Sequence, residues 1–367
     1  MDRRRFVQTA ALGAPLAGLA PAAAAGAPPR PAQVVQPREP VRPRRLARGS
    51  HLRLVSPAGH VGRSSVRRAQ ERLAAFGFET SLGRHTLDRL GYLAGSDRER
   101  AADLRDAFLD DSVDGIVSTR GGWGCARLLP HLDLDAARAN PKAVMGFSDV
   151  TALLLALYAH ADLVTFHGPN ATSSLRGLTG VAFRQVVMEG ARPTLLEPPL
   201  RPEPREPLVG PDGTVMPMPP APEPGPVTTA LRAGRARGRL AGGNLSVLSA
   251  LVGSPWLPDF RGHILVLEDV SEAIYRVDRM LTHLALAGVF DGVAGVVLGR
   301  CRGCAPESPQ DFSLQEVYQH HLLPLDVPVF MDAAIGHVTP KLTIPIGVEA
   351  EMDADAGSIR LLEAAVR

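Results

Sequence analysis

Lysine is almost absent from this chain of 367 residues, in which Lys142 and Lys341 are the two lysines and arginine supplies nearly all of the positive charge. That charge is unevenly placed. The first 48 residues hold nine arginines against Asp2 and Glu39, a net charge of +7, so the total of +2 leaves 2 − 7 = −5 for residues 49–367. A mildly acidic body argues against nucleic acid as the partner.

Cysteine is also scarce, with three in the chain. Cys301 and Cys304 form a lone C-x-x-C, and no second Cys/His pair has the spacing of a zinc site. These two residues form either a small-loop disulfide or a pair of free thiols, and Cys125 has no evident role. The metalloprotease pattern H-E-x-x-H is missing too. We therefore expect neither a metal nor a cofactor.

No apolar run is long enough to span a bilayer stably. Arg3-Arg4-Arg5-Phe6 followed by a weakly apolar stretch resembles a twin-arginine export signal, with a plausible cleavage site at Ala25-Gly26-Ala27. We predict a signal peptide over residues 1–27 and a periplasmic protein. If the segment is only an Ala-rich tail, the protein stays in the cytoplasm. The Pro/Arg-rich residues 28–48 are predicted to be a disordered linker.

Alternating apolar strands and amphipathic helices follow, which is typical of a mostly parallel sheet flanked by helices. Ser96 and Glu99 have the spacing of a helix capping box. We predict an N-terminal α/β domain over residues 49–190, a Pro-rich connection over 191–235 and a second α/β domain over 236–367. Strands are expected at 52–55, 78–82, 115–118, 143–147, 263–267, 293–299, 327–331, 342–346 and 358–362, and helices at 64–76, 97–108, 149–158, 273–287 and 314–323.

Ser148 lies between a short apolar strand and the helix that follows it. A hydroxyl at such a turn points out of the end of a sheet, beside the free N–H groups of a helix N-terminus. An acyl-transfer nucleophile needs this combination. The alternative is that Ser148 only caps the helix. The turn Arg120-Gly121-Gly122-Trp123-Gly124 also follows a strand, but it matches neither nucleotide-binding glycine motif.

The chain resembles the LD-carboxypeptidases, a family of serine peptidases, through an ordered set of short motifs. They are Tyr92-Leu93-Ala94-Gly95-Ser96-Asp97, Arg120 to Gly124, Met145 to Thr151, Phe166-His167-Gly168-Pro169, Gly242-Gly243-Asn244-Leu245, Leu267-Glu268-Asp269-Val270, Tyr275 to Met280 and Ile335-Gly336-His337. The resemblance covers residues 50–175 and 235–350. Trp123 and Phe147 stand where the family often has tyrosine, so each keeps the ring without the hydroxyl.

The resemblance implies an N-terminal α/β domain and a C-terminal domain built around a small β-barrel. It also implies a Ser–Glu–His triad, with Ser148 as the nucleophile, His337 as the general base and Glu268 as the acid that orients the base. Each lies just after a predicted strand. Asp269 is the rival for Glu268, and His167 is the rival base.

For the oxyanion hole we expect the backbone N–H of Asp149 and one from the glycine turn, with Gly122 ahead of Gly121. A carboxypeptidase also needs a cation for the terminal carboxylate of its substrate. Arg120 is the candidate, because a guanidinium binds a carboxylate bidentately. A buried structural ion pair is the alternative role for Arg120. Trp123 is expected to contact substrate.

We therefore expect a carboxypeptidase that releases a C-terminal D-amino acid, D-Ala from peptidoglycan tetrapeptides first of all. The same triad with another pocket would cleave a peptidyl-nucleotide antibiotic. Two other classes remain open: a non-catalytic protein that binds wall peptides, and a nucleotide-binding oxidoreductase, which the glycine turn supports poorly. The family resemblance suggests a homodimer, with no nucleic-acid partner and no stable membrane span after signal cleavage.

Overall fold

The computed structural model of the chain describes residues 39–190, 195–196 and 228–367. The predicted signal peptide, residues 28–38 of the predicted linker and most of the Pro-rich connection lie outside these ranges. The described residues belong to one compact unit. No helix within them has the length and the apolar character that crossing a membrane requires.

The first sheet is built from short, buried, apolar strands in the order β12-β5-β4-β3-β1-β2. The first five strands in the chain run parallel, whereas β12 pairs antiparallel to β5. Their bounds are β1 (His51–Val55), β2 (Glu79–Leu82), β3 (Gly115–Ser118), β4 (Ala143–Gly146), β5 (Thr165–His167) and β12 (Ile344–Ile346).

The second sheet has the order β6-β14-β13-β8-β9-β10-β11-β7 and curls into a half-barrel. Its centre, β8 to β11, is parallel, and antiparallel strands flank it on both sides. The strands are β6 (Leu195–Leu196), β7 (Thr229–Arg232), β8 (Arg235–Asn244), β9 (His263–Glu268), β10 (Gly295–Gly299), β11 (Val329–Ala333), β13 (Glu349–Asp353) and β14 (Ser358–Leu361). The predicted α/β fold, with a parallel-rich first sheet and a barrel-like second sheet, is confirmed, and the second sheet is a curled half-barrel.

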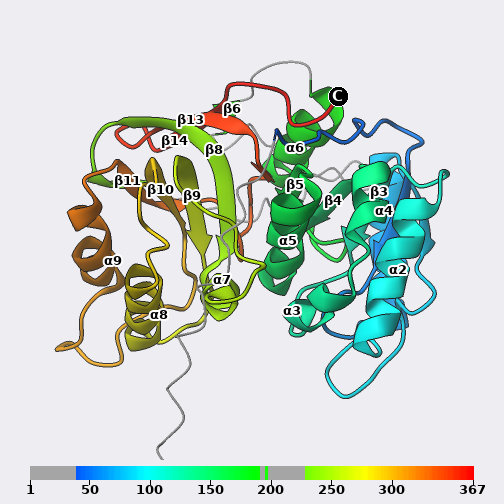
Figure 1. Cartoon of the computed structure of the whole chain (residues 1–367), viewed down its shortest axis with the longest axis horizontal. Coiled ribbons are helices and arrows are strands. Elements are labelled where there is room, and N and C mark those ends of the chain that lie inside the picture. The colour runs from blue at the N-terminus through cyan, green and yellow to red at the C-terminus, as the bar shows by residue number, and fades with distance from the viewer. Residues whose placement is uncertain (1–38, 191–194, 197–227) are drawn as a thin grey trace, which may run out of the picture. The chain divides into compact units, whose positions relative to one another are not determined.

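Helices cover the sheets, and α5 lies at the centre of the molecule between them (Figure 1). Nearly every residue of α5 is buried, as expected for a helix that is apolar on all sides. The helices are α1 (Arg63–Phe76), α2 (Asp97–Leu109), α3 (Cys125–Leu128), α4 (Leu134–Ala139), α5 (Thr151–Ala161), α6 (Leu178–Arg184), α7 (Leu245–Leu251), α8 (Ile274–Leu286) and α9 (Leu314–Leu322). The predicted capping box of Ser96 and Glu99 is present at the start of α2.

The two sheets do not divide cleanly between the halves of the chain. The predicted strand at 342–346 was assigned to the second domain, but β12 completes the first sheet by pairing Ile344 with His167. Both hydrophobic cores also draw side chains from both halves. The domain boundaries stay a prediction. Cys301 and Cys304 form a disulfide, so of the two alternatives for this pair the free thiols are excluded.

The predicted disorder of residues 28–48 is wrong for the described part of that segment. Val41 forms an isolated parallel bridge with Leu163, two residues before β5, and the backbone N–H of Leu46 donates to the carbonyl of Val187 at 2.9 Å. The Leu46 side chain is only 2% exposed. The Pro/Arg-rich composition gave no sign that Leu46 packs in the hydrophobic core or that the backbone of Val41 pairs with Leu163. The predicted connection 191–235 likewise contains β6 and β7, both at edges of the second sheet.

We predict that Leu46→Ala lowers the free energy of unfolding by about 2–5 kcal/mol, the usual cost of truncating a buried leucine. Urea denaturation followed by circular dichroism measures it. Arg44→Ala, at an exposed neighbouring position, is the control and should leave the midpoint unchanged. Equal midpoints for the Leu46 variant and the parent would restore the disordered-linker interpretation.

Candidate active site

Ser148 occupies a sharp turn between β4 and α5. Its φ of +66° lies in the left-handed region, which non-glycine residues enter at a cost and mostly at functional sites. Nucleophilic serines of α/β hydrolases stand on this kind of strand-to-helix turn. No side-chain cap is present at the start of α5, so the alternative that Ser148 serves as the helix cap is wrong.

The glycine turn at 120–124 packs directly against Ser148. A Cβ on Gly121 would lie 2.7 Å from the Cβ of Ser148 and 2.9 Å from its Oγ, so no larger residue fits there. The Oγ of Ser118 donates to the carbonyl of Arg120 at 2.9 Å, and the carboxylate of Asp149 accepts from the N–H of Cys125 at 2.8 Å. The first bond fixes the start of the glycine turn, and the second ties the residue after that turn to the serine turn. Burial raises the pKa of Asp149.

Glu268 ends β9 with a fully buried carboxylate. It accepts a hydrogen bond from Nδ1 of His337 at 2.8 Å, and Nε2 of His167 lies 3.6 Å from its other oxygen. Burial by itself raises the pKa of a carboxyl, but the favourable interactions with the two neighbouring histidines, His167 and His337, outweigh burial and lower the pKa of Glu268 to about 2. Because an ionised carboxylate only accepts, Nδ1 of His337 carries the proton and Nε2 is free to act as a base.

Asp269, the rival of Glu268, has a structural task. Its carboxylate accepts from the backbone N–H and the hydroxyl of Ser246 in the first turn of α7, at 2.9 and 2.6 Å. His167, the rival base, is 2% exposed and does not line the cavity that holds Ser148. These placements favour Glu268 and His337 over both rivals.

His337 follows β11 on a tight loop. Gly336 has φ +80°, and a Cβ at that position would lie 2.0 Å from the Oε2 of Glu268. Glycine is therefore required for His337 to reach the buried carboxylate. The imidazole also packs edge-on against the ring of Phe147, with centroids 4.9 Å apart.

A cavity of about 500 Å³ brings most of the predicted site together. Ser148, His337, Gly122 and Arg120 line it. Trp123 is not among the described lining residues: its side chain is 65% exposed and packs edge-on against Tyr92. Arg120 is exposed and forms no ion pair with any described residue, so it does not have the alternative role of a buried ion pair.

The sequence analysis missed Asn170 and Lys341. Asn170 lines the cavity, and its side-chain oxygen accepts from the N–H of Phe147 at 3.3 Å. Lys341 is 7% exposed and its ammonium lies 3.6 Å from the centroid of the Phe147 ring, a cation–π contact. Burial lowers its pKa to about 8. Because the chain has only two lysines, the position of Lys341 four residues after His337 could have marked it as a residue near the site.

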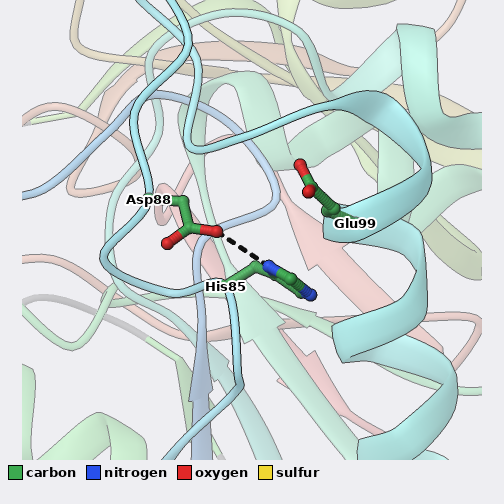
Figure 2. A group of neighbouring side chains, drawn as sticks. All are labelled: His85, Asp88 and Glu99. Carbon is green, nitrogen blue, oxygen red and sulfur yellow. Dashed lines mark hydrogen bonds and ion pairs between the residues drawn. The ribbon is translucent and has the colours of Figure 1, made fainter.

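Among the described residues, His85, Asp88 and Glu99 are the group close enough together to suggest a metal site (Figure 2). Nδ1 of His85 lies 2.7 Å from a carboxylate oxygen of Asp88, and the Asp88 hydrogen bond raises the pKa of His85. Glu99 is already engaged, because its Oε2 accepts from the N–H of Ser96 in the capping box at 2.7 Å. We assign these residues a structural role. None of the three lines the cavity.

Two family models match the chain in succession. The LD-carboxypeptidase N-terminal domain matches residues 52–168, and the LD-carboxypeptidase C-terminal domain matches residues 237–352. A putative carboxypeptidase of Streptomyces coelicolor is 39% identical over 88% of this chain and 97% of its own length. A probable murein peptide carboxypeptidase of Bacillus subtilis is 31% identical, covering 89% and 95%.

Solved structures agree with these matches. The microcin C7 self-immunity protein MccF, known from Escherichia coli, superposes with a TM-score of 0.78 at 28% identity, covering 89% of this chain and all of that one. The muramoyltetrapeptide carboxypeptidase of Oxalobacter formigenes gives a TM-score of 0.68 at 26% identity, covering 85% and 98%. The likeness therefore extends over nearly the full length of each chain compared.

Glu268→Gln should slow the reaction of Ser148 with a fluorophosphonate probe by about 10,000-fold, because the amide no longer enforces the reactive tautomer of the histidine. Labelling followed by intact-protein mass spectrometry measures the rate. The matched control is Asp269→Asn, which should cost about 1 kcal/mol of stability by weakening the hydrogen bonds from Ser246 and leave labelling unchanged. A labelling defect in the Asp269 variant alone would reverse the two assignments.

Lys341→Met should stabilise the protein at pH 7. The pKa of Lys341 is 10.5 in the unfolded chain and about 8 in the fold, so the unfolded state binds more protons between these values. The parent therefore gains stability as pH rises from 8 to 10.5, whereas methionine does not titrate. We expect the variant to be about 3 kcal/mol more stable at pH 7 and the gap to close by pH 10.5.

Chemical denaturation of the parent and the Lys341 variant across this pH range measures the gap. A difference that stays constant from pH 7 to 10.5 would contradict the prediction.

Proposed function

The chain belongs to the LD-carboxypeptidase family, and we propose that it is a serine carboxypeptidase that hydrolyses an L,D-amide bond to release D-Ala from peptidoglycan tetrapeptides. One observation carries this proposal: Ser148 and His337 line the same cavity, and the far side of the imidazole is hydrogen-bonded to the buried carboxylate of Glu268. The relatives from Bacillus subtilis and Oxalobacter formigenes, a probable murein peptide carboxypeptidase and a muramoyltetrapeptide carboxypeptidase, support the substrate class.

In the proposed mechanism, Oγ of Ser148 attacks the carbonyl carbon of the scissile amide while Nε2 of His337 accepts the hydroxyl proton. The C–N bond then breaks, and His337 returns that proton to the leaving amine of D-Ala. Water hydrolyses the acyl-enzyme by the same route. Glu268 fixes the tautomer of His337 and stabilises the imidazolium that forms in each step.

The negative oxygen of each tetrahedral intermediate needs donors that are already in place. We assign this task to the backbone N–H groups of Asp149 and Gly122. Gly121 packs on the serine, and Gly122 lines the same cavity. Losing one such donor typically costs about 100- to 1,000-fold in rate.

The terminal carboxylate of the substrate is assigned to Arg120. Arg120 lies on the same turn as Gly122, one of the two assigned oxyanion donors, and forms no ion pair with a described acid. We keep Trp123 as a proposed substrate contact outside the cavity, because it adjoins Gly122 in the chain and its side chain is exposed. No step of this chemistry calls for a metal or cofactor.

Cleavage of a peptidyl-nucleotide antibiotic is the second candidate, favoured by the superposition on the microcin C7 self-immunity protein. A non-catalytic role in binding wall peptides has less support, because the strained serine turn and the His337–Glu268 pair would then serve no purpose. We further propose export through the twin-arginine-like segment, a periplasmic location and a homodimeric state, all of which rest on the sequence and the family.

The deciding experiment is release of D-Ala from L-Ala-γ-D-Glu-diaminopimelyl-D-Ala by the mature chain, measured beside Ser148→Ala. We expect release by the parent and a loss of about 10⁶-fold or more in the variant, as for other serine nucleophiles. Equal release by both would remove Ser148 as the nucleophile. No release by the parent would remove the tetrapeptide as the substrate and direct the assay to peptidyl-nucleotides.

A further inference from the structure

We infer that the wall of the cavity formed by helix α1 is a second anion subsite, which binds a carboxylate on the acyl side of the scissile amide. The subsite consists of Arg68, Arg72 and the N-terminal turn of α1 from Gly62 to Ser65. It deepens the proposed function and rests on it, because it specifies which tetrapeptides the cavity accepts. Neither the catalytic residues nor Arg120 belong to it.

The charges that line the cavity are of one sign. Arg68, Arg72 and Arg120 line it, and none of the lining residues within the described ranges is acidic. Neither Arg68 nor Arg72 has a carboxylate partner among the described residues. Their neighbour Arg67, which does not line the cavity, is paired with Glu71 one turn further along the helix. On helix α1, Arg67 thus has an acidic partner, whereas Arg68 and Arg72 at the cavity have none among the described residues.

The N-terminus of α1 adds to this positive field. Val61, Gly62 and Ser65 line the cavity, so the first turn of this 14-residue helix faces it. No side chain caps that end, and its first turn holds no acidic residue. An uncapped helix N-terminus presents backbone N–H groups and the positive end of the helix dipole, a combination that favours anions.

Arg72 is fixed in place for binding. Its Nη2 donates to the carbonyl of Thr172 at 3.0 Å and lies 3.4 Å from that of Ala171, while its Nε–H is buried without a partner. A guanidinium held by neutral carbonyls keeps its full charge and has lost its rotamer freedom before the ligand arrives. Such preorganisation lowers the entropic cost of binding.

The terminal carboxylate of the substrate is too little negative charge to neutralise the positive groups that line the cavity. One negative charge pairs with Arg120, which leaves two guanidinium groups and a helix N-terminus without counter-charge. Peptidoglycan tetrapeptides carry further carboxylates on the acyl side: the α-carboxylate of D-Glu, which is linked through its γ-carboxyl, and the second carboxylate of diaminopimelate. Either one supplies the missing charge, and a charge-assisted hydrogen bond to it is stronger than a neutral one.

Three substrates test the subsite: the tetrapeptide, its analogue with an α-carboxamide on D-Glu, and its analogue with lysine in place of diaminopimelate. We expect the parent to prefer the full acid over one analogue by about 10- to 100-fold in kcat/KM, the value of hydrogen bonds to a charged group. The analogue with the lower kcat/KM identifies the carboxylate that the subsite binds. Arg68→Gln with Arg72→Gln should reduce the preference to about twofold or less.

Arg67→Gln is the matched control, since it removes an arginine from the same helix but not from the cavity, and it should keep the full preference. The single Arg68→Gln variant, at an exposed position, guards against misfolding of the double variant and should lose part of the preference. Equal kcat/KM of the parent for all three peptides would overturn the subsite. So would a preference that persists in the double variant.

A binding measurement distinguishes failure of the proposed function from failure of the proposed subsite. If the parent releases no D-Ala, the three peptides are titrated calorimetrically into Ser148→Ala, alone and combined with the two arginine substitutions. Tighter binding of the full acid that disappears with the arginines would support the subsite even though the reaction is another one. Absent binding, or equal affinity for all three peptides, would overturn it.

Discussion

The buried carboxylate of Glu268 is the interaction on which the site depends. Removing a carboxylate from water costs several kcal/mol, so its charge persists here only because partners surround it. His337 is hydrogen-bonded to it at 2.8 Å, Asn244 donates to it at 3.4 Å, and His167 lies 3.6 Å away. These partners come from the loop after β11, the end of β8 and the end of β5. One charge therefore ties both sheets to the imidazole and keeps the base in its reactive tautomer.

The cavity is positively charged, although residues 49–367 as a whole carry a net negative charge. That net negative charge repels an acidic peptide at long range. The cavity presents Arg68, Arg72 and Arg120, and Lys341 lies buried behind the Phe147 ring. Attraction is thus confined to the site. The positive cavity therefore selects acidic ligands only at short range. Added salt should screen the exposed arginines of the cavity more than its buried charges.

Local patterns were enough to predict most strands, the five longest helices and the turn that carries Ser148, because hydrophobic period and turn residues are properties of short segments. They did not predict β5, β6, β7, β8, β13 or the short helices α3, α4, α6 and α7. Glu268 and His337 required the family resemblance, since nothing in a sequence fixes which distant strand ends meet. For the same reason the pairing of β12 with β5 was missed: an isolated apolar strand does not reveal its sheet. The α1 arginines escaped notice because arginine is common throughout this chain and only the cavity distinguishes two of them.

The position of β12 has a consequence for how the protein is made. A ribosome delivers the chain from its N-terminus, so β12 (Ile344–Ile346) emerges long after β5 (Thr165–His167). Until then β5 has an open edge, the kind of unpaired strand that recruits other chains. A nascent chain stalled before residue 344 would therefore hold a nearly complete first sheet with an unpaired strand edge on the side of β5 that faces away from β4. Translation speed over the second half of the message thus sets how long that edge stays exposed.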